Sequence, residues 1–337
     1  MGLKGHGTML KKSNKYISVF IPVFNGEQYL SECLESILNQ ELPDGYRLEV
    51  LVIDSGSTDK SLDILSVYND RISLHTIPNS EFSHGGTRDK AARLAKGEFV
   101  LFLSQDATPT NYQWIKFMIE PFFLSDKIGC VFGRQIPRPN AAATIKREVA
   151  TVFGSLGASD SIVLHRNKSY IDQSATNPLN SFYSDVNSAA RRELLINDVP
   201  FQHVHYAEDQ ALATDMQNAG YTKAYAPAGS VWHSNEYTAK QYYMRKFDEY
   251  IGLQESVKIK LEPSLRSLTL GWIRPTLADW RFIRHDSEYK FKSKILWAIE
   301  SPFYNIAEQA GKYSAAKNIN NEKVRKNSSL EYQARKK

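Results

Sequence analysis

The sequence predicts an α/β protein with a mostly parallel central sheet flanked by helices. Two predominantly apolar runs, at 48–53 and 99–103, have the length and composition of buried parallel strands. Segments with helical spacing of apolar residues alternate with strands through the first hundred residues. The length of 337 residues and the hydrophobic content of 42% allow a large core with an appended region.

The first half of the chain shows the alternation most clearly. A flexible lead is expected at 1–15. The elements that follow, in chain order, are a strand at 16–23, a helix at 27–40, a strand at 48–54, a helix from 57 to about 68, a strand at 72–77, a helix at 88–96 that Gly97 ends, and a strand at 99–103.

The pattern is looser from 111 to 240, where strands and helices no longer alternate strictly. The expected elements are a helix at 112–123, a strand at 128–135, a helix at 205–219 that ends at Gly220, and short strands at 221–225 and 230–233. Beyond about 240 the chain is aromatic, basic and mostly helical. We therefore expect a helical extension at 241–311 and a basic tail at 312–337.

Cysteine use and the N-terminal segment indicate a cellular location. Cys33 and Cys130 lie in apolar contexts far apart in the sequence and resemble small buried hydrophobic residues of a reducing compartment. The first residues lack the apolar stretch of a signal peptide, and no run of about 18 apolar residues suggests a membrane span. We expect a cytoplasmic protein, either free or peripheral on the inner face of the cell membrane.

The C-terminal third carries much of the positive charge. The formal net charge is +5, and residues 312–337 contain eight Lys or Arg against two Glu. Such a tail is typical of a solvated, flexible terminus, and it could also bind an anionic membrane surface or nucleic acid. We do not expect nucleic acid as a partner. Aromatic and basic residues also interleave at 237–250 and 272–297. This composition suits a membrane interface, and an oligomer or domain contact explains it equally well.

Polar side chains follow three of the predicted strands. Asn25 follows the first strand, Asp54 and Ser57 follow the second, and Asp106 follows the strand at 99–103. Because ligands of open α/β sheets bind beyond the carboxyl ends of the strands, these residues predict a nucleotide site. Asp106 is placed to hold a divalent cation, or simply to cap the next element. The loop at 83–89 adds Arg88, whose guanidinium suits a diphosphate.

Several of these segments together carry a family resemblance. In order along the chain they are Ile21–Asn25, Val52–Asp59, Gly97–Val100 and Phe102–Ala107. With them the chain resembles family 2 glycosyltransferases, which have the GT-A fold, from about residue 16 to about 240. The segment 82–89, taken with Ser104–Ala107, resembles the rhamnosyltransferase branch of that family.

The resemblance implies a nucleotide-binding half at 16–110 and an acceptor half at 111–240. It assigns the nucleotide sugar to a set of residues in the first half, namely Pro22, Val23, Asn25, Asp54, Ser57, Arg88, Gln105 and Asp106. The family's D-x-D motif falls on Ser104–Asp106, so Ser104 stands where the first carboxylate is usual and only Asp106 is retained. Asp106 and His233 are the implied ligands of Mg²⁺ or Mn²⁺.

The acceptor half supplies the implied catalytic residues. Asp209 corresponds to the general base, and Glu208 orients the site or touches the acceptor. Two acids at a helix start also have a purely structural explanation, because the helix dipole favours them there. Asn187, Arg191 and Trp232 are candidates for the donor-sugar or acceptor pocket. For Asn187 and Arg191 the start of a surface helix is the alternative.

The implied function is that of an inverting glycosyltransferase. The expected donor is dTDP-L-rhamnose, and the expected acceptor is a lipid-linked saccharide of bacterial surface polysaccharide such as O-antigen. A Q-x-x-R-W motif is missing after Asp209, which favours addition of a single sugar. One alternative is a family member with a UDP-hexose donor. Another is a non-catalytic protein that binds nucleotide or saccharide. This alternative rests on Ser104, which stands where the family usually has the first metal-binding carboxylate. Homo-oligomerisation is compatible with the sequence.

Overall fold

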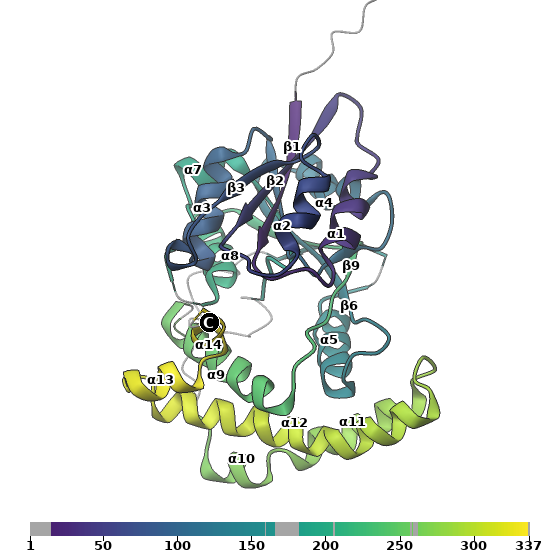
Figure 1. Cartoon of the computed structure of the whole chain (residues 1–337), viewed down its shortest axis with the longest axis vertical. Helices are drawn as coiled ribbons and strands as arrows, with labels where there is room; N and C mark the ends of the chain where they lie inside the picture. The colour runs from purple at the N-terminus through teal and green to yellow at the C-terminus, as the bar shows by residue number, and fades with distance from the viewer. Residues whose placement is uncertain are drawn as a thin grey trace, which may run out of the picture.

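The computed structural model describes residues 15–158, 160–165, 182–204, 206–256, 258 and 262–335. The lead predicted at 1–15 lies outside the described residues except for Lys15. Figure 1 shows a central sheet with helices on both sides, and a separate layer of C-terminal helices along one end of the molecule. The expected α/β fold with a helical C-terminal region is confirmed.

The described residues form one sheet of nine strands in the order β3-β2-β1-β4-β8-β6-β9-β5, with β7 beside β9. The strands are β1 (Lys15–Val23), β2 (Tyr46–Asp54), β3 (Ser73–Thr76), β4 (Phe99–Leu103), β5 (Thr108–Pro109), β6 (Ile128–Ile136), β7 (Val163–His165), β8 (Asn187–Arg191) and β9 (Thr222–Trp232). The pairings among β1 to β4 are parallel, as predicted. The sheet becomes mixed at β8, which runs antiparallel to both β4 and β6.

Helices cover both faces of the sheet and enclose two apolar cores. One face carries α1 (Leu30–Leu38), α2 (Ser61–Val67) and α4 (Trp114–Leu124). The other face carries α3 (His84–Leu94), α5 (Ala143–Ser155), α7 (Arg192–Asn197) and α8 (Glu208–Asn218). A short 3₁₀ turn, η1 (Asn79–Glu81), precedes α3. The sheet is therefore the middle of three layers.

Two local predictions are corrected by the structure. The segment 83–89, predicted as a loop, is the start of α3, because the Ser83 side chain caps this helix by accepting from the Gly86 amide at 3.2 Å. The two strands predicted at 221–225 and 230–233 are the single strand β9. Residues 227–230, which include Pro227, bulge out of its pairing with β6, and a bulge tolerates the missing proline N–H.

Among the described residues of the C-terminal region there are six helices. They are α9 (Ala239–Ser256), α10 (Leu265–Leu270), α11 (Ile273–His285), α12 (Phe291–Lys317), α13 (Glu322–Ser328) and α14 (Leu330–Arg335). Asp279 of α11 is fully buried and joins this layer to α5 of the sheet domain. It forms an ion pair with Arg147 of α5 and accepts a hydrogen bond from Thr144 at 2.8 Å.

Residues 312–335 of the basic tail form the end of α12 and the helices α13 and α14, which corrects the interpretation of this stretch as a flexible terminus. The carboxylate of Asp248 on α9 accepts hydrogen bonds from the amides of Leu330 and Glu331, at 2.8 and 3.2 Å, and so caps α14. As a result, α14 returns to the sheet domain and lies beside α3, where Glu331 Oε2 is 3.2 Å from His84 Nε2.

Candidate active site

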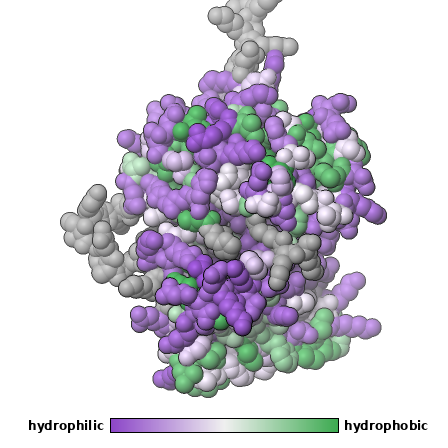
Figure 2. Space-filling model, turned by 60° about the vertical axis from the view of Figure 1, so that its left-hand side comes forward, coloured by the Kyte–Doolittle hydropathy of each residue, from purple (hydrophilic) through white to green (hydrophobic). Residues whose placement is uncertain are grey.

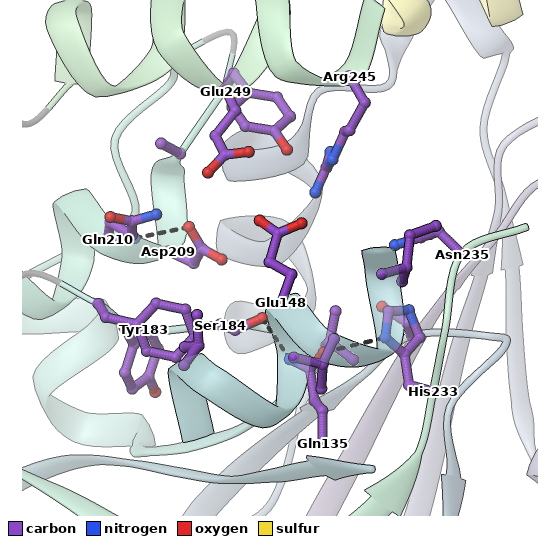
Figure 3. Close-up of a pocket in the computed structure, with 18 of the residues that line it drawn as sticks. Gln135, Glu148, Tyr183, Ser184, Asp209, Gln210, His233, Asn235, Arg245 and Glu249 are labelled. Atoms are coloured by element: carbon purple, nitrogen blue, oxygen red, sulfur yellow. Dashed lines mark hydrogen bonds between the residues drawn. The ribbon is translucent and has the colours of Figure 1, made fainter. Parts of the chain in front are cut away.

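A cavity of about 350 Å³ lies at the carboxyl end of the sheet, between the sheet, α5, α8 and α9. The predicted site residues that line it are Arg88, Asp106, Glu208, Asp209 and His233. In Figure 3, Asp209 and His233 lie on opposite sides of the cavity, with Glu148 between them and Arg245 entering from α9. Residues far apart in the sequence thus meet in one place.

The loops after β1 and β2 are tied together by the predicted polar residues. Asn25 adopts a left-handed backbone conformation, with φ of 50°, and its side-chain oxygen accepts from the Thr58 amide at 2.8 Å. The Asn25 amide donates to Ser57 Oγ at 2.9 Å. Because asparagine tolerates this conformation better than most residues, the sequence fits the geometry. Asn25 and Ser57 therefore shape this edge of the sheet.

Asp54 lies at the end of β2, beside Val23 of β1 in the parallel register. One carboxylate oxygen, Oδ2, accepts from the amides of Gly56 and Ser57 at 2.9 and 3.1 Å. The other oxygen, Oδ1, is buried and has no hydrogen-bond partner among the described residues. An unpaired buried acceptor is costly unless a ligand supplies a donor. Pro22 and Val23 complete the adjoining end of β1.

Gln105 lies at the same edge but is already engaged by the protein. Its Oε1 accepts from the Phe24 amide at 2.9 Å, and its Nε2 donates to the Phe24 carbonyl at 3.0 Å. Both ends of the side-chain amide are thus used to hold the loop after β1. The structure places Gln105 as a residue that positions the loop, and its contact with a nucleotide sugar stays a prediction.

Asp106 and His233 form the expected pair of metal-ligating side chains. His233 Nε2 lies 3.4 Å from Asp106 Oδ2, while His233 Nδ1 lies 3.1 Å from Gln135 Oε1. Gln135 is held in turn by its Nε2, which donates to Ser184 Oγ at 3.0 Å. An Nδ1 proton donated to Gln135 leaves the Nε2 lone pair facing Asp106, as a metal ligand requires.

The donor set at this pair fits a divalent cation such as Mg²⁺ or Mn²⁺. Burial by itself would raise the pKa of Asp106, but when the His233 ring is protonated, and no metal takes its Nε2, its charge and hydrogen bond lower that pKa below its usual value. Asp106 is therefore held as a carboxylate. Among the residues that the structure describes, no group of three or more His, Cys, Asp or Glu side chains surrounds a common point. A cation here would complete its shell with oxygens from ligand and water.

The predicted catalytic acids lie in a cluster of three carboxylates. Glu208 and Asp209 open α8, and Asp185 lies across from them just before β8. Arg88 Nη1 is 2.9 Å from Glu208 Oε1, and Arg88 Nε is 2.9 Å from Asp185 Oδ2. Arg88, whose guanidinium was expected to bind the diphosphate, therefore forms ion pairs with two carboxylates instead. Gly85 permits this approach, because a Cβ there would lie 1.9 Å from the Gln202 carbonyl oxygen.

Within the described ranges, Asp209 is the member of the cluster that forms no ion pair. Its Oδ1 accepts from the Gln210 amide at 2.7 Å, and its Oδ2 accepts from the Asp185 amide at 3.3 Å. Burial, together with repulsion from Glu208 and Asp185, raises its pKa well above the usual value of an aspartate. α8 begins from Ala207, whose backbone is left-handed with φ of 60°. The cluster thus presents to the cavity a carboxylate that binds a proton more readily than an ordinary aspartate.

The three remaining candidates have other contacts in the structure. Asn187 is fully buried, accepts from Trp114 Nε1 at 3.0 Å and donates to the Gly229 carbonyl at 2.7 Å. Arg191 donates to the carbonyls of Ile128 and Phe122. Trp232 ends β9 and lies opposite Thr108 of β5. None of the three lines the cavity, because each is used to join the sheet to its neighbours.

Sequence reasoning missed the cavity wall supplied by α5 and α9. Lys246 forms an ion pair with Glu148, and Tyr242 donates to Glu148 Oε2 at 2.7 Å. Arg245 stacks over the Tyr206 ring at 4.8 Å, and within the described part of the chain its guanidinium has no ion pair. The aromatic and basic pattern at 237–250 was the available signal. Its members Tyr242, Lys246 and Phe247 are buried, so these three side chains are not part of an exposed membrane-binding face.

The comparisons with known proteins identify the family. The model of glycosyl transferase family 2 matches residues 18–197. The chain belongs to this family. Among its relatives, the O-antigen chain rhamnosyltransferase RfbN of Salmonella typhimurium is 31% identical over 69% of this chain and 70% of its own length. The rhamnosyltransferase WbaN of Salmonella anatum is 34% identical over 59% of this chain, which spans 61% of WbaN.

Solved structures support the GT-A fold of this family 2 chain. A mannosyltransferase from Pyrobaculum calidifontis, solved with GDP-mannose and Mn²⁺, superposes with a TM-score of 0.56 at 17% identity, over 91% of this chain and 87% of that one. The glucosyl-3-phosphoglycerate synthase of Mycobacterium tuberculosis, solved with Mn²⁺, UDP and phosphoglyceric acid, superposes with a TM-score of 0.50 at 18% identity, over 75% and 82%. The chain thus belongs to glycosyl transferase family 2 by its sequence, and its fold is GT-A.

Proposed function

We propose that this glycosyltransferase moves L-rhamnose from dTDP-L-rhamnose to a hydroxyl of a saccharide acceptor, with inversion at the anomeric carbon. The observation that carries the proposal is the pair formed by Asp209 on one side of the cavity and Asp106 with His233 on the other. The cavity of about 350 Å³ that these residues line has the size of a small-molecule site, and we propose that the sugar lies in it between the base and the diphosphate. The choice of rhamnose is supported by the names of RfbN and WbaN.

Asp209 is the proposed general base. It takes the proton of the acceptor hydroxyl as that oxygen forms its bond to the anomeric carbon, and the bond from that carbon to the diphosphate oxygen breaks. Attack from the face opposite the leaving group inverts the configuration, and the nucleoside diphosphate departs with the bonding electrons. The raised pKa of Asp209 makes its carboxylate a stronger base than an ordinary aspartate.

Glu208 and Arg88 are proposed to hold the base in place. The ion pair between Arg88 Nη1 and Glu208 Oε1 neutralises Glu208, the acid that directly precedes Asp209. Without the guanidinium, three carboxylates would repel one another and could not all remain ionised. Arg88 therefore acts on the reaction through the carboxylates, and we assign the diphosphate to other groups.

Asp106 and His233 are the proposed holders of a Mg²⁺ or Mn²⁺ ion. Such an ion, when bound, would neutralise charge on the diphosphate and so ease departure of the nucleotide. Within the chain itself, Gln135 orients the His233 ring toward Asp106. Ser104 also lines the cavity and offers a hydroxyl where a second carboxylate is usual in the family.

Arg245 is the proposed protein cation for the diphosphate. It lines the cavity, has no ion pair within the described residues, and is oriented by its contact with the Tyr206 ring at 4.8 Å. A free guanidinium can donate two parallel hydrogen bonds to phosphate oxygens. Arg245 therefore takes the role that the sequence suggested for Arg88.

Asp54 Oδ1 is the proposed acceptor for the nucleobase. Thymine and uracil each carry an imide N–H, which would satisfy this buried oxygen, whereas cytosine lacks one. The geometry thus supports a thymidine or uridine diphosphate and does not separate the two. A UDP-hexose donor is the second candidate, because Asp54 Oδ1 would accept the imide N–H of uracil in the same way.

The acceptor is proposed to be a lipid-linked saccharide of bacterial surface polysaccharide, as the names of the O-antigen relatives suggest. A panel of nucleotide sugars, each tested with Mn²⁺, with Mg²⁺ and with EDTA, tests the donor. Selective turnover of dTDP-L-rhamnose that EDTA abolishes would support the proposal. Turnover of a UDP-hexose instead would discard the rhamnose assignment. Binding of nucleotide without turnover, with acceptor saccharide present, would favour the non-catalytic alternative.

A further inference from the structure

The C-terminal helical layer carries an exposed apolar surface, here called the α10–α12 face. Its exposed large apolar residues are Leu265, Leu270, Ile273, Leu277, Trp280, Phe291, Ile295, Leu296, Ile299, Phe303 and Ile306. Figure 2 shows hydrophobic residues gathered at the lower end of the molecule, where these helices lie. Single exposed apolar residues are ordinary, but a contiguous group of this kind marks an interaction surface.

The periodicity shows that each helix has one packed and one unpacked side. On α12, positions 291, 295, 299 and 303 recur every fourth residue and are all exposed, with Phe291 at 77% and Ile299 at 60%. Tyr304 and Asn305, on the other side of α12, are buried. A helix that packs on one side is expected to be polar on the other. The apolar residues on the unpacked side therefore call for a partner.

Trp280 shows how the face is held in shape. Its indole Nε1 donates to the Ala298 carbonyl at 2.9 Å, which joins α11 to α12, while the side chain remains 45% exposed. α12 also packs against α9, the helix that brings Arg245 to the cavity. In Figure 1, α10 and α12 lie at the end of the molecule away from the sheet. α9 thus contacts both the cavity and α12, the helix that carries part of the α10–α12 face.

Charge on these helices identifies the kind of partner. Residues 265–306 contain seven Lys or Arg and four Asp or Glu. Three of the acids, Asp279, Asp286 and Glu288, form ion pairs with Lys146 or Arg147 of α5. Six exposed cations have no ion pair among the residues that the structure describes, namely Arg266, Arg274, Arg281, Arg284, Lys290 and Lys292. The face is thus apolar with an unneutralised basic border.

We propose that the α10–α12 face binds the surface of an anionic lipid bilayer. Apolar and aromatic side chains would enter the interface, and the border cations would meet lipid phosphates. A second copy of this chain fits less well, because a two-fold contact would bring the same unpaired cations together. No helix within the described ranges is long and apolar enough to cross a membrane. The proposal goes beyond the proposed function, since it concerns a surface away from the cavity.

Co-sedimentation with vesicles tests the proposal on the full chain. Vesicles of phosphatidylcholine, with and without phosphatidylglycerol, are compared at low and high salt. We expect binding to the anionic vesicles alone, weakened by salt. The triple variant Phe291→Ser/Ile299→Ser/Phe303→Ser and the triple variant Arg274→Gln/Arg281→Gln/Arg284→Gln should each lower the partition coefficient about tenfold or more. Val67→Ser removes a side chain of α2 that is 78% exposed, and it should change nothing.

Two results would overturn the proposal. One is the absence of wild-type binding to anionic vesicles at low salt. The other is a stable dimer in light scattering that the Phe291→Ser/Ile299→Ser/Phe303→Ser variant converts to monomer, while lipid binding is unaltered. Turnover of a soluble nucleotide sugar by the two triple variants should equal that of wild type. This second readout separates loss of the membrane surface from failure of the proposed function.

Discussion

Arg88 Nη1 lies 2.9 Å from Glu208 Oε1, and the same guanidinium contacts Asp185, so Arg88 pairs with two carboxylates beside Asp209. Its side chain is only 8% exposed, which makes the ion pairs buried ones. A buried charge that loses its partner is strongly destabilising. The site therefore depends on Arg88 for assembly of its acids, whatever else the residue contacts.

Arg88→Lys is the first test of this arrangement. The lysine keeps the charge but cannot reach two carboxylates in a fork, so we expect unfolding to require roughly 1–3 kcal/mol less free energy in urea titration. Binding of dTDP, measured by calorimetry on the folded variant, should change less than about threefold. A tenfold loss of dTDP affinity with unaltered stability would instead place Arg88 at the diphosphate.

Arg245→Ala is expected to show the opposite pattern. Removal of a guanidinium that binds phosphate oxygens should weaken dTDP about tenfold or more, which corresponds to roughly 1.4 kcal/mol. Stability should fall little, because Arg245 has no ion pair among the described residues to break. Arg47→Ala, which removes an exposed arginine of β2, is the matched control. Equal dTDP affinity in both variants would contradict the assignment.

The sequence predicted the edge of the sheet better than the rest of the site. Asp54, Asp106, Asp209 and His233 all lie where strand ends and a helix start were expected, because local patterns fix such positions. The pairing of Arg88 could not be predicted, since it depends on how closely α3 approaches α8. That approach is set by Gly85 against the Gln202 carbonyl, a contact between residues far apart in the chain.

Long-range packing also explains the other differences. Asn187 belongs to a polar cluster that precedes Glu208 and Asp209 in the sequence, which suggested a pocket, yet it is fully buried and bonded to Trp114 and Gly229. The basic and aromatic pattern of α9 was visible in the sequence, but composition alone does not tell a cavity wall from a surface. The structure separates the two: α9 lines the cavity, and α10 to α12 carry the exposed residues.

Asp54→Asn tests the proposed contact with the nucleobase. The change replaces a charged acceptor with an amide that can present a donor, so dTDP and UDP should each bind about ten- to a hundredfold more weakly. Binding of CDP, which lacks the imide N–H, should be weak in wild type and little altered in the variant. The exposed Asp63→Asn on α2 serves as control. A preference for thymine and uracil that survives in Asp54→Asn would count against this contact.

Gln135→Ala tests the orientation of His233. Loss of the acceptor at Nδ1 frees the imidazole to rotate and to change tautomer, so Mn²⁺ should bind about ten- to a hundredfold more weakly in the presence of dTDP. Electron paramagnetic resonance of free Mn²⁺ measures this directly. Gln113→Ala, which removes an exposed glutamine next to Glu41, should leave Mn²⁺ binding unaltered. Equal binding in the two variants would remove His233 from the metal site.

The acid cluster makes both activity and stability depend on pH. Because the pKa of Asp209 is raised, kcat/KM should rise with pH as its carboxylate loses the proton. Burial, with Glu208 as a repulsive neighbour and Arg88 opposing it, raises the pKa of Asp185 to about 6. The folded state therefore binds protons more tightly than the unfolded state, and this contribution to stability falls as pH rises from about 4 through 6. Thermal unfolding across this range, compared between wild type and Asp209→Asn, measures the effect. The melting temperature should fall less steeply with rising pH in Asp209→Asn than in wild type.

The most direct measurement is the rate at which dTDP is released from dTDP-L-rhamnose by wild type and by Asp209→Asn, with Mn²⁺ and saccharide acceptor present. If Asp209 is the base of an inverting transfer, the variant should lose about a thousandfold or more in kcat while its melting temperature stays level or rises, since a repelled charge has been removed. Turnover by Asp209→Asn at the wild-type rate would contradict the assignment of Asp209 as the general base.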